Sequence, residues 1–215
     1  MNVQCVEQHR CFGGMQNKYT HYSKVLKCEM TFSLFLPSNQ TMKKIPLIWW
    51  LSGLTCTDDN FSQKSGFQRL AEQHQVAVIV PDTSPRGEDV ADDDAYDLGK
   101  GAGFYVNATQ KPWSEHYQMY TYIVDELKEI AHTLVPRFSG EESIMGHSMG
   151  GHGALVIGMK NPTRFKAISA FAPILCPSQA PWGIKAFTAY LGEDLSFWKE
   201  WDAAELVKEV NIPPI

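Results

Sequence analysis

One serine in this chain stands in a pattern that prepares a hydroxyl for nucleophilic attack. Ser148 occupies the centre of the sequence Gly146-x-Ser148-x-Gly150. The apolar residues that end at Met145 indicate the end of a strand, and those from Ala154 onward indicate a helix. A serine at such a strand-to-helix turn is a nucleophile elbow, and small flanking residues permit its sharp turn. The alternative is a glycine-rich turn whose serine only caps the helix.

Acyl transfer by a serine also needs hydrogen-bond donors aimed at the oxyanion that develops in the reaction. The backbone N–H of Met149, directly after the serine, is one predicted donor. The second donor should come from the loop after an earlier central strand, and residues 51–56 (LSGLTC) have this position. Gly53 lets the chain turn back there, so the N–H of Leu54 is the second predicted donor. An ordinary strand-to-helix turn is the alternative for this segment.

The serine also needs a base, which in turn needs an orienting group. Enzymes with this elbow carry their residues in the order Ser, then Asp or Glu, then His. Only His152 follows Ser148, and it precedes every later acid. His147 should project away from the hydroxyl, and His116 precedes a predicted helix. We therefore expect that the last strands of the fold, with the acid and the histidine, are missing from this sequence.

Other motifs carry weaker signals. Cys56 lies beside the predicted oxyanion loop, where a small buried thiol and a functional thiol are both possible. The glycines of residues 99–103 follow an acidic loop, not a strand, so they do not match a phosphate-binding pattern. Residues 92–94 lack the ligand spacing of a calcium loop. His147 and His152 are five residues apart, whereas a helical metal pair needs four. The sequence predicts neither a metal nor a cofactor.

The elements that must position these residues alternate between strands and helices. The pattern predicts strands at 30–36, 45–51, 76–80 and 167–171, and helices at 62–75, at 117–134 and after Asp202. Such alternation predicts an α/β fold with a mostly parallel sheet covered by helices on both faces. Residues 83–113 show neither a helical nor a strand period of apolar residues, so they predict a long loop. A loop of that length inside a compact domain is usually functional.

Composition limits the function classes. A chain of 215 residues can form one sizeable core, so we expect a single domain over 1–215. The net charge of −5 argues against nucleic acid as a partner. The chain has no apolar run of membrane-spanning length and no signal-peptide pattern at its start. Its five cysteines are odd in number and form no C-x-x-C pair, which favours the reducing cytoplasm.

Several longer motifs resemble those of the esterase D family of S-formylglutathione hydrolases, in the same order along the chain. They are CFGG at 11–14, WLSGLTCTDDNF at 50–61, PDTSPRG at 81–87, GAGFYVNAT at 101–109, GHSMGGHGAL at 146–155, SAFAPI at 169–174 and PWGIKAFTAYLG at 181–192. The resemblance implies a cytoplasmic α/β-hydrolase that often forms homodimers. It implies cleavage of S-formylglutathione to glutathione and formate in formaldehyde detoxification, with hydrolysis of simple esters as a further activity.

The resemblance also implies roles for individual residues. Ser148 matches the nucleophile, and Leu54 and Met149 match the oxyanion positions. Cys56 matches a thiol that makes family members sensitive to thiol reagents, and Trp182 falls in the segment that helps wall the acyl pocket. The family's acid and base lie in D-Q-G and G-Y-D-H-S stretches that have no counterpart in this sequence.

The sequence therefore predicts a serine hydrolase that acts on a small thioester or ester through an acyl intermediate on Ser148. Within that class, a general short-chain carboxylesterase is the alternative. From a different class, a non-catalytic relic that serves as a binding module is the alternative. Because it lacks a convincing base, the chain as written is expected to be inactive alone.

Overall fold

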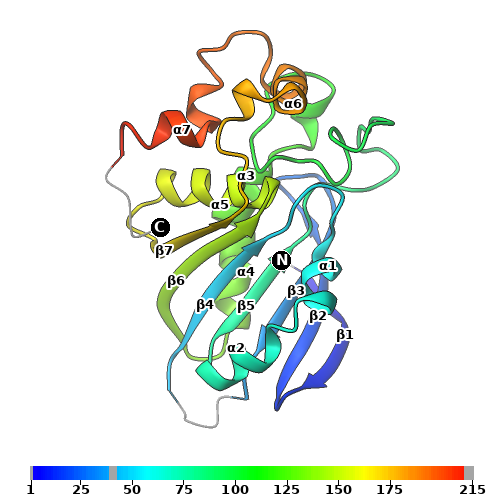
Figure 1. Ribbon diagram of the computed structural model, residues 1–215. Helices are drawn as coiled ribbons and strands as arrows, with labels where there is room; N and C mark the ends of the chain where they lie inside the picture. The colour runs from blue at the N-terminus through cyan, green and yellow to red at the C-terminus, as the bar shows by residue number, and fades with distance from the viewer. Residues whose placement is uncertain (1, 39–42, 211–215) are drawn as a thin grey trace.

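A computed structural model describes residues 2–38 and 43–210 of the chain. In these ranges the backbone forms one seven-stranded sheet with the order β1-β2-β3-β5-β4-β6-β7 (Figure 1). The strands are β1 (Val3–Cys11), β2 (Gly14–Ser23), β3 (Cys28–Leu36), β4 (Ile45–Leu51), β5 (Ala77–Pro81), β6 (Phe138–His147) and β7 (Phe165–Phe171).

The sheet is mixed, and its two parts differ in direction. β5, β4, β6 and β7 pair in parallel, as the sequence predicted for the strands around the elbow. β1, β2 and β3 pair antiparallel, and β3 also runs antiparallel to β5. The β1–β2 hairpin is not among the predicted elements, because most residues of β1 are exposed and give no apolar alternation. The α/β class is confirmed, and the expectation of a mostly parallel sheet applies only to the half that carries the elbow.

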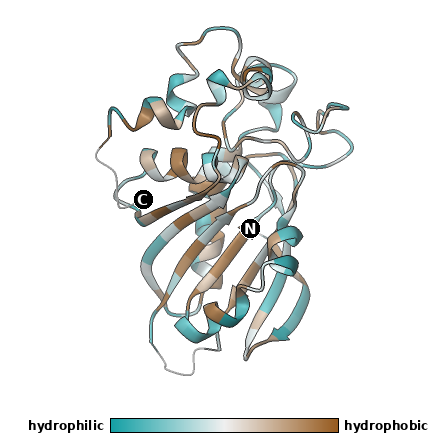
Figure 2. Cartoon of the chain, in the orientation of Figure 1, coloured by the Kyte–Doolittle hydropathy of each residue, from teal (hydrophilic) through white to brown (hydrophobic). Residues whose placement is uncertain are grey.

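Helices cover both faces of the sheet, as predicted. Leu47 and Trp49 of β4 belong to the larger core, under α5 (Met149–Lys160) and the helical segment that ends in α4. Ile48 and Trp50 point to the opposite face, where they pack with Phe61 and Phe67. The helices on that face are α1 (Asp58–Lys64) and α2 (Gln68–His74). Figure 2 shows the apolar residues concentrated along the central strands.

The predicted helix over 62–75 is wrong as one element. The chain forms two short helices there, because α1 ends at Lys64 and Gly66 then adopts a left-handed φ of 69°. Leu70, which the helical spacing assigned to the apolar stripe, is 52% exposed. The predicted helix over 117–134 is confirmed from Met119 onward, as α3 (Met119–Thr121), the π-helical turn η2 (Tyr122–Glu126) and α4 (Leu127–Leu134).

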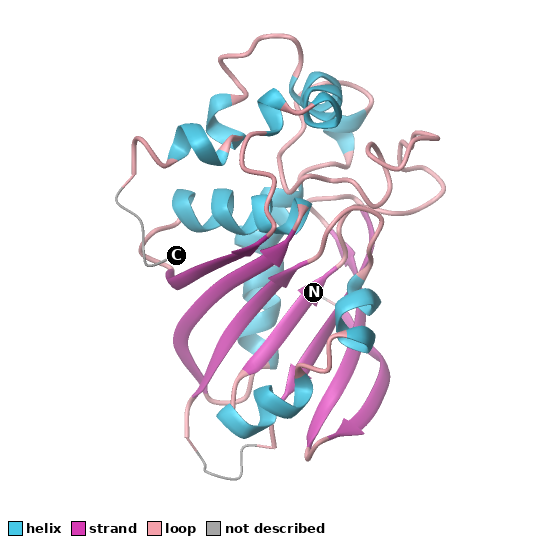
Figure 3. Cartoon of the chain, in the orientation of Figure 1, coloured by secondary structure: helices cyan, strands magenta, loops and turns pink. Residues whose placement is uncertain are grey.

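The long segment after β5 is a loop, as predicted, and contains no regular helix or strand between residues 83 and 112. The remaining elements are η1 (Trp113–Glu115), η3 (Pro177–Gln179), α6 (Pro181–Leu191), η4 (Lys199–Trp201) and α7 (Ala203–Leu206). The predicted cap of the last helix is confirmed, since the Asp202 side chain accepts a hydrogen bond from the Ala204 N–H. Figure 3 shows the long loops gathered at the carboxyl ends of the parallel strands.

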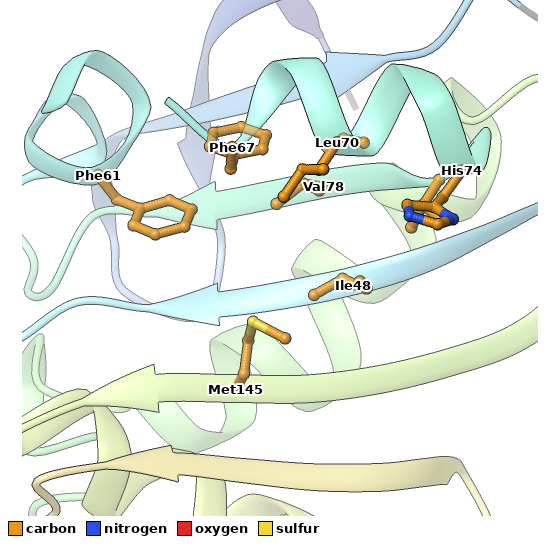
Figure 4. A pocket seen from close by; sticks show the side chains of 9 residues that line it. Ile48, Phe61, Phe67, Leu70, His74, Val78 and Met145 are labelled. Carbon is orange, nitrogen blue, oxygen red and sulfur yellow. The ribbon is translucent and has the colours of Figure 1, made fainter. Parts of the chain in front are cut away.

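An apolar groove of about 340 Å³ lies on the α1–α2 face of the sheet, away from the strand ends. Its labelled side chains come from β4, β5, β6 and the two helices (Figure 4): Ile48, Phe61, Phe67, Leu70, His74, Val78 and Met145. Among the described residues, no helix is both long enough and apolar enough to cross a bilayer.

Candidate active site

Ser148 lies between the end of β6 and the start of α5, which is the position that the sequence predicted. Its φ and ψ are 58° and −119°. A positive φ is unfavourable for a residue with a side chain and costs on the order of 1–3 kcal/mol, so the surrounding structure must impose it. This conformation is that of the strained turn that lifts a nucleophilic hydroxyl clear of the backbone.

Two glycines of the motif let the elbow lie directly against the end of β4. A Cβ atom on Gly150 would lie 2.0 Å from the carbonyl oxygen of Leu51. A Cβ atom on Gly146 would lie 2.1 Å from the carbonyl oxygen of Gly150. Both distances are far below van der Waals contact, so no residue with a side chain fits at either position without moving the backbone. Gly146 and Gly150 are thus required because the elbow turns tightly on itself and lies against the end of β4.

The segment after β4 lies beside the serine. A Cβ atom on Gly53 would lie 3.2 Å from the Cβ atom of Ser148, so Gly53 also permits a close approach. Leu54 follows in a turn and is half-buried, and Thr55 adopts a left-handed φ of 65°. Met149 is fully buried as the first residue of α5. The structure thus brings the two predicted donor residues to the same end of the sheet as Ser148, and their donor role stays a prediction.

An open pocket with a volume of about 330 Å³ adjoins this turn. It is lined by Trp50, Ser52, Gly53, Cys56, Asn60, Phe61, His147 and Phe171. Cys56 is among the lining residues, and its functional role stays a prediction. Burial raises the pKa of the Cys56 thiol, which favours its neutral form.

Three aromatic residues of this pocket were missed by the sequence analysis. Trp50 and Phe61 are stacked, with ring centroids 3.7 Å apart, and the Phe171 ring lies 6.0 Å from Trp50. The strand period contained the signal for Trp50, because Trp50 and Ser52 lie two residues apart at the end of β4 and share a face. Phe61 and Phe171 reach the pocket from α1 and β7, so only the folded chain brings them there.

Trp182 has a different position from the one expected of a pocket residue. It lies at the start of α6 and does not line the pocket at the elbow. Its ring centroid is 6.2 Å from that of Phe104, which lies 6.4 Å from the ring of His152. Its role at the acyl group stays a prediction.

Three histidines, His21, His116 and His152, are buried. His152 follows one helical turn after Ser148 and its backbone N–H donates to the Ser148 carbonyl at 3.0 Å, but its side chain is fully buried. Burial lowers the pKa of His152 to about 4, so the ring is neutral near pH 7. The His21 ring shares a hydrogen bond with the Tyr122 hydroxyl, and the His116 ring shares one with the Leu26 carbonyl. None of the hydrogen bonds within residues 2–38 and 43–210 joins a histidine ring to the Ser148 hydroxyl.

Across the described residues, no group of three or more His, Cys, Asp or Glu side chains is arranged to hold a metal ion. A serine hydroxyl beside an apolar pocket can support acyl transfer where a base and backbone N–H donors are in place.

The mixed sheet, the helices on both faces and the strained serine between β6 and α5 define an α/β-hydrolase. A family model described as "Putative esterase" matches residues 23–212. The chain belongs to this esterase family.

Solved structures agree with this assignment. An S-formylglutathione hydrolase from Agrobacterium tumefaciens is 47% identical, with a TM-score of 0.94, over 99% of this chain and 77% of that chain. A fluorophosphonate-binding serine hydrolase from Staphylococcus aureus, FphF, is 21% identical, with a TM-score of 0.72, over 93% of this chain and 76% of that chain. An S-formylglutathione hydrolase from Staphylococcus aureus is 19% identical, with a TM-score of 0.65, over 92% of this chain and 76% of that chain. The last two show a shared fold.

Proposed function

We propose that this protein is a serine hydrolase that cleaves the thioester of S-formylglutathione to glutathione and formate. The observation that carries the proposal is the strained elbow at Ser148, packed against Gly53, in a chain 47% identical to an S-formylglutathione hydrolase over 99% of its length. Chemistry of this type uses a hydroxyl, a base and backbone donors, and calls for neither a metal nor an organic cofactor.

The proposed reaction has two steps. In the first, the Ser148 oxygen attacks the formyl carbon, and the N–H groups of Leu54 and Met149 stabilise the oxyanion. The carbon–sulfur bond then breaks and releases the glutathione thiolate, which leaves readily because an ordinary thiol has a pKa of about 8.5. In the second step, water attacks the formyl ester on Ser148 and releases formate.

The proton of the Ser148 hydroxyl must pass to a general base in the first step. We assign this role to none of the histidines in the described residues, because His152 is buried and His21, His116 and His132 are bonded to other groups. His147 lines the pocket next to the serine, but no hydrogen bond links its ring to the hydroxyl in the described residues.

A general short-chain carboxylesterase is the second candidate, and the apolar pocket favours it. Trp50, Phe61 and Phe171 present aromatic surface beside the serine, which suits an aryl or alkyl ester as well as the stem of a thioester. The homodimer and the cytoplasmic location that the resemblance implies belong to the same proposal, and size-exclusion chromatography tests the first of them.

The experiment uses one preparation of the full-length protein and compares kcat/KM for S-formylglutathione with kcat/KM for p-nitrophenyl acetate. We expect a preference of at least about 10-fold for the thioester, since a site built for the glutathione moiety gains binding contacts that the aryl acetate lacks. Equal values would support the carboxylesterase instead. Intact-mass measurement after exposure to p-nitrophenyl acetate tests the non-catalytic alternative, because a binding module would gain no acetyl group.

A further inference from the structure

The long loop between β5 and η1 has a buried inner part that reaches the proposed active site. Phe104, Tyr105 and Val106 are fully buried. Phe104 and Tyr105 both adopt left-handed backbone conformations, with φ values of 50° and 56°. Two successive aromatic residues with positive φ are unfavourable, so strong packing must hold them in place. The loop is therefore a fixed part of the structure at this point.

The side chain of Tyr105 contacts both segments that form the proposed oxyanion hole. Its hydroxyl donates a hydrogen bond of 2.8 Å to the carbonyl oxygen of Ser52, two residues before Leu54. Its ring lies against Gly153 of α5, where a Cβ atom would come within 2.5 Å of the Tyr105 Cδ2 atom. One side chain thus sets the distance between the loop that carries Leu54 and the helix that begins at Met149.

The same long loop also holds the other side of Leu54. The Thr55 N–H donates to the Gly101 carbonyl at 2.9 Å. The Cys56 carbonyl accepts hydrogen bonds from the Thr83 hydroxyl at 2.5 Å and from the Arg86 guanidinium at 3.2 Å. Residues 52, 55 and 56 are therefore each fixed by a group of the long loop, and Leu54 lies between these fixed points.

We propose that Tyr105 is a positioning residue for the oxyanion hole, which fixes residues 52–56 against α5 and thereby aims the Leu54 N–H at the oxyanion. This inference rests on the proposed function, since it assumes that Leu54 is a donor. Tyr105 does not line the pocket at the elbow, so its proposed effect passes through the loop. Burial raises the pKa of Tyr105 well above its ordinary value, so its hydroxyl keeps its proton and remains a donor.

Tyr105→Phe tests the proposal, and Tyr117→Phe is its matched control. Tyr117 is also fully buried, and its hydroxyl also donates to a backbone carbonyl, that of Ala91 at 2.6 Å. Each change removes one buried hydrogen bond and keeps the ring, so the two unfolding midpoints should fall by similar amounts. Only Tyr105→Phe should slow the acylation of Ser148.

We expect Tyr105→Phe to lower kcat for p-nitrophenyl acetate by about 10-fold, less than the loss of a whole oxyanion donor, with KM within about 2-fold. The rate of inactivation by a fluorophosphonate should fall in parallel, because its phosphoryl oxygen occupies the same hole. Tyr117→Phe should stay within about 2-fold of the unchanged protein in both measurements.

The outcomes separate this inference from the proposed function. Equal rates for Tyr105→Phe and Tyr117→Phe, with an inactive Ser148→Ala, overturn the inference and leave the proposed function in place. Full activity of Ser148→Ala, or no acylation of the unchanged protein, overturns the proposed function and the inference with it. Amide hydrogen exchange gives a readout without turnover: exchange in residues 52–56 should be faster in Tyr105→Phe than in Tyr117→Phe, and equal protection contradicts the proposal.

Discussion

Two polar residues, one on strand β6 and one just past its end, have opposite surroundings. Glu142 is buried and bonded to three side chains: the Trp49 indole at 2.6 Å, the His132 ring at 2.9 Å and the Arg164 guanidinium at 2.9 Å. The hydroxyl of Ser148, just past the end of the same strand, has no hydrogen-bond partner within the described residues. The Glu142 carboxylate thus has several hydrogen-bond partners. The Ser148 hydroxyl has none, and its residue has a strained backbone conformation.

The difference separates a structural polar group from a candidate functional one. A buried carboxylate without partners would cost several kcal/mol, so Glu142 is retained with its full set of donors. A nucleophile must keep its hydroxyl free for a base and a substrate, and the proposed role of Ser148 accounts for both its unpartnered hydroxyl and its strained backbone. Changes at the two positions should therefore act on different quantities, activity at one and stability at the other.

The largest expected effect is on activity, at Ser148. Ser148→Ala should lower the rate of acylation by p-nitrophenyl acetate by at least about 10⁴-fold, because it removes the proposed nucleophile. The free energy of unfolding should change by less than about 1 kcal/mol, since the hydroxyl makes no hydrogen bond in the described residues. Stopped-flow acylation and urea unfolding measure the two quantities. Retained acylation would remove Ser148 from the mechanism.

The next effect is on stability, at Glu142. Glu142→Ala should lower the free energy of unfolding by about 3–5 kcal/mol, because it removes a buried carboxylate and leaves the half-buried Arg164 guanidinium without its charge partner. Where the variant is folded, acylation at Ser148 should proceed at the unchanged rate. Glu142→Gln keeps the shape and is the control for packing. If a stably folded Glu142→Gln variant lost activity, Glu142 would affect activity as well as stability, and the distinction drawn between Glu142 and Ser148 would be wrong.

The pH dependence of stability should follow Glu142 in acid. Burial raises the pKa of this carboxyl, but the hydrogen bonds from His132, Arg164 and Trp49 and the Arg164 charge lower it more, to about 2 from an ordinary value of 4.5. A lowered pKa in the folded state stabilises the fold above pH 4.5, and this contribution is lost as the pH falls toward 2.

The contribution amounts to about 3–4 kcal/mol, since the pKa falls from 4.5 to about 2 and one pKa unit corresponds to about 1.4 kcal/mol. Urea unfolding between about pH 6.5 and about pH 2.5, roughly 2 units either side of the ordinary pKa of 4.5, measures it. Glu142→Gln should flatten the acid limb of the curve. An identical slope in the variant would show that other carboxylates determine the acid sensitivity.

The smallest expected effect lies at the contact between the elbow and the oxyanion loop. Gly53→Ala places a Cβ atom 3.2 Å from the Cβ atom of Ser148, so one of the two segments must shift by a few tenths of an ångström. Acylation should slow by about 10-fold, since small displacements of reacting groups are costly. The unfolding midpoint serves as the control. An unchanged rate would mean that this contact does not set the geometry of the site.

Much of this site could be predicted from local sequence. The Ser148 elbow, the β4 strand over 45–51 and the turn at Gly53 lie where their residues predicted them, because each depends on sterics within a few neighbouring residues. The β1–β2 hairpin could not be predicted, since the residues of its first strand are mostly exposed and show no alternation of apolar and polar residues. The single helix expected over 62–75 was wrong, because Gly66 breaks it with a left-handed turn.

The sequence by itself determined which residue occupies the strained turn after β6 and which loop lies beside it, because glycine and serine spacing controls those turns directly. Only the tertiary structure decided what fixes that loop and what lines the pocket. Tyr105 lies 53 residues from its acceptor on Ser52, and Phe61 and Phe171 approach Trp50 from separate elements. No local pattern encodes such contacts, since they exist only when the sheet brings distant segments together.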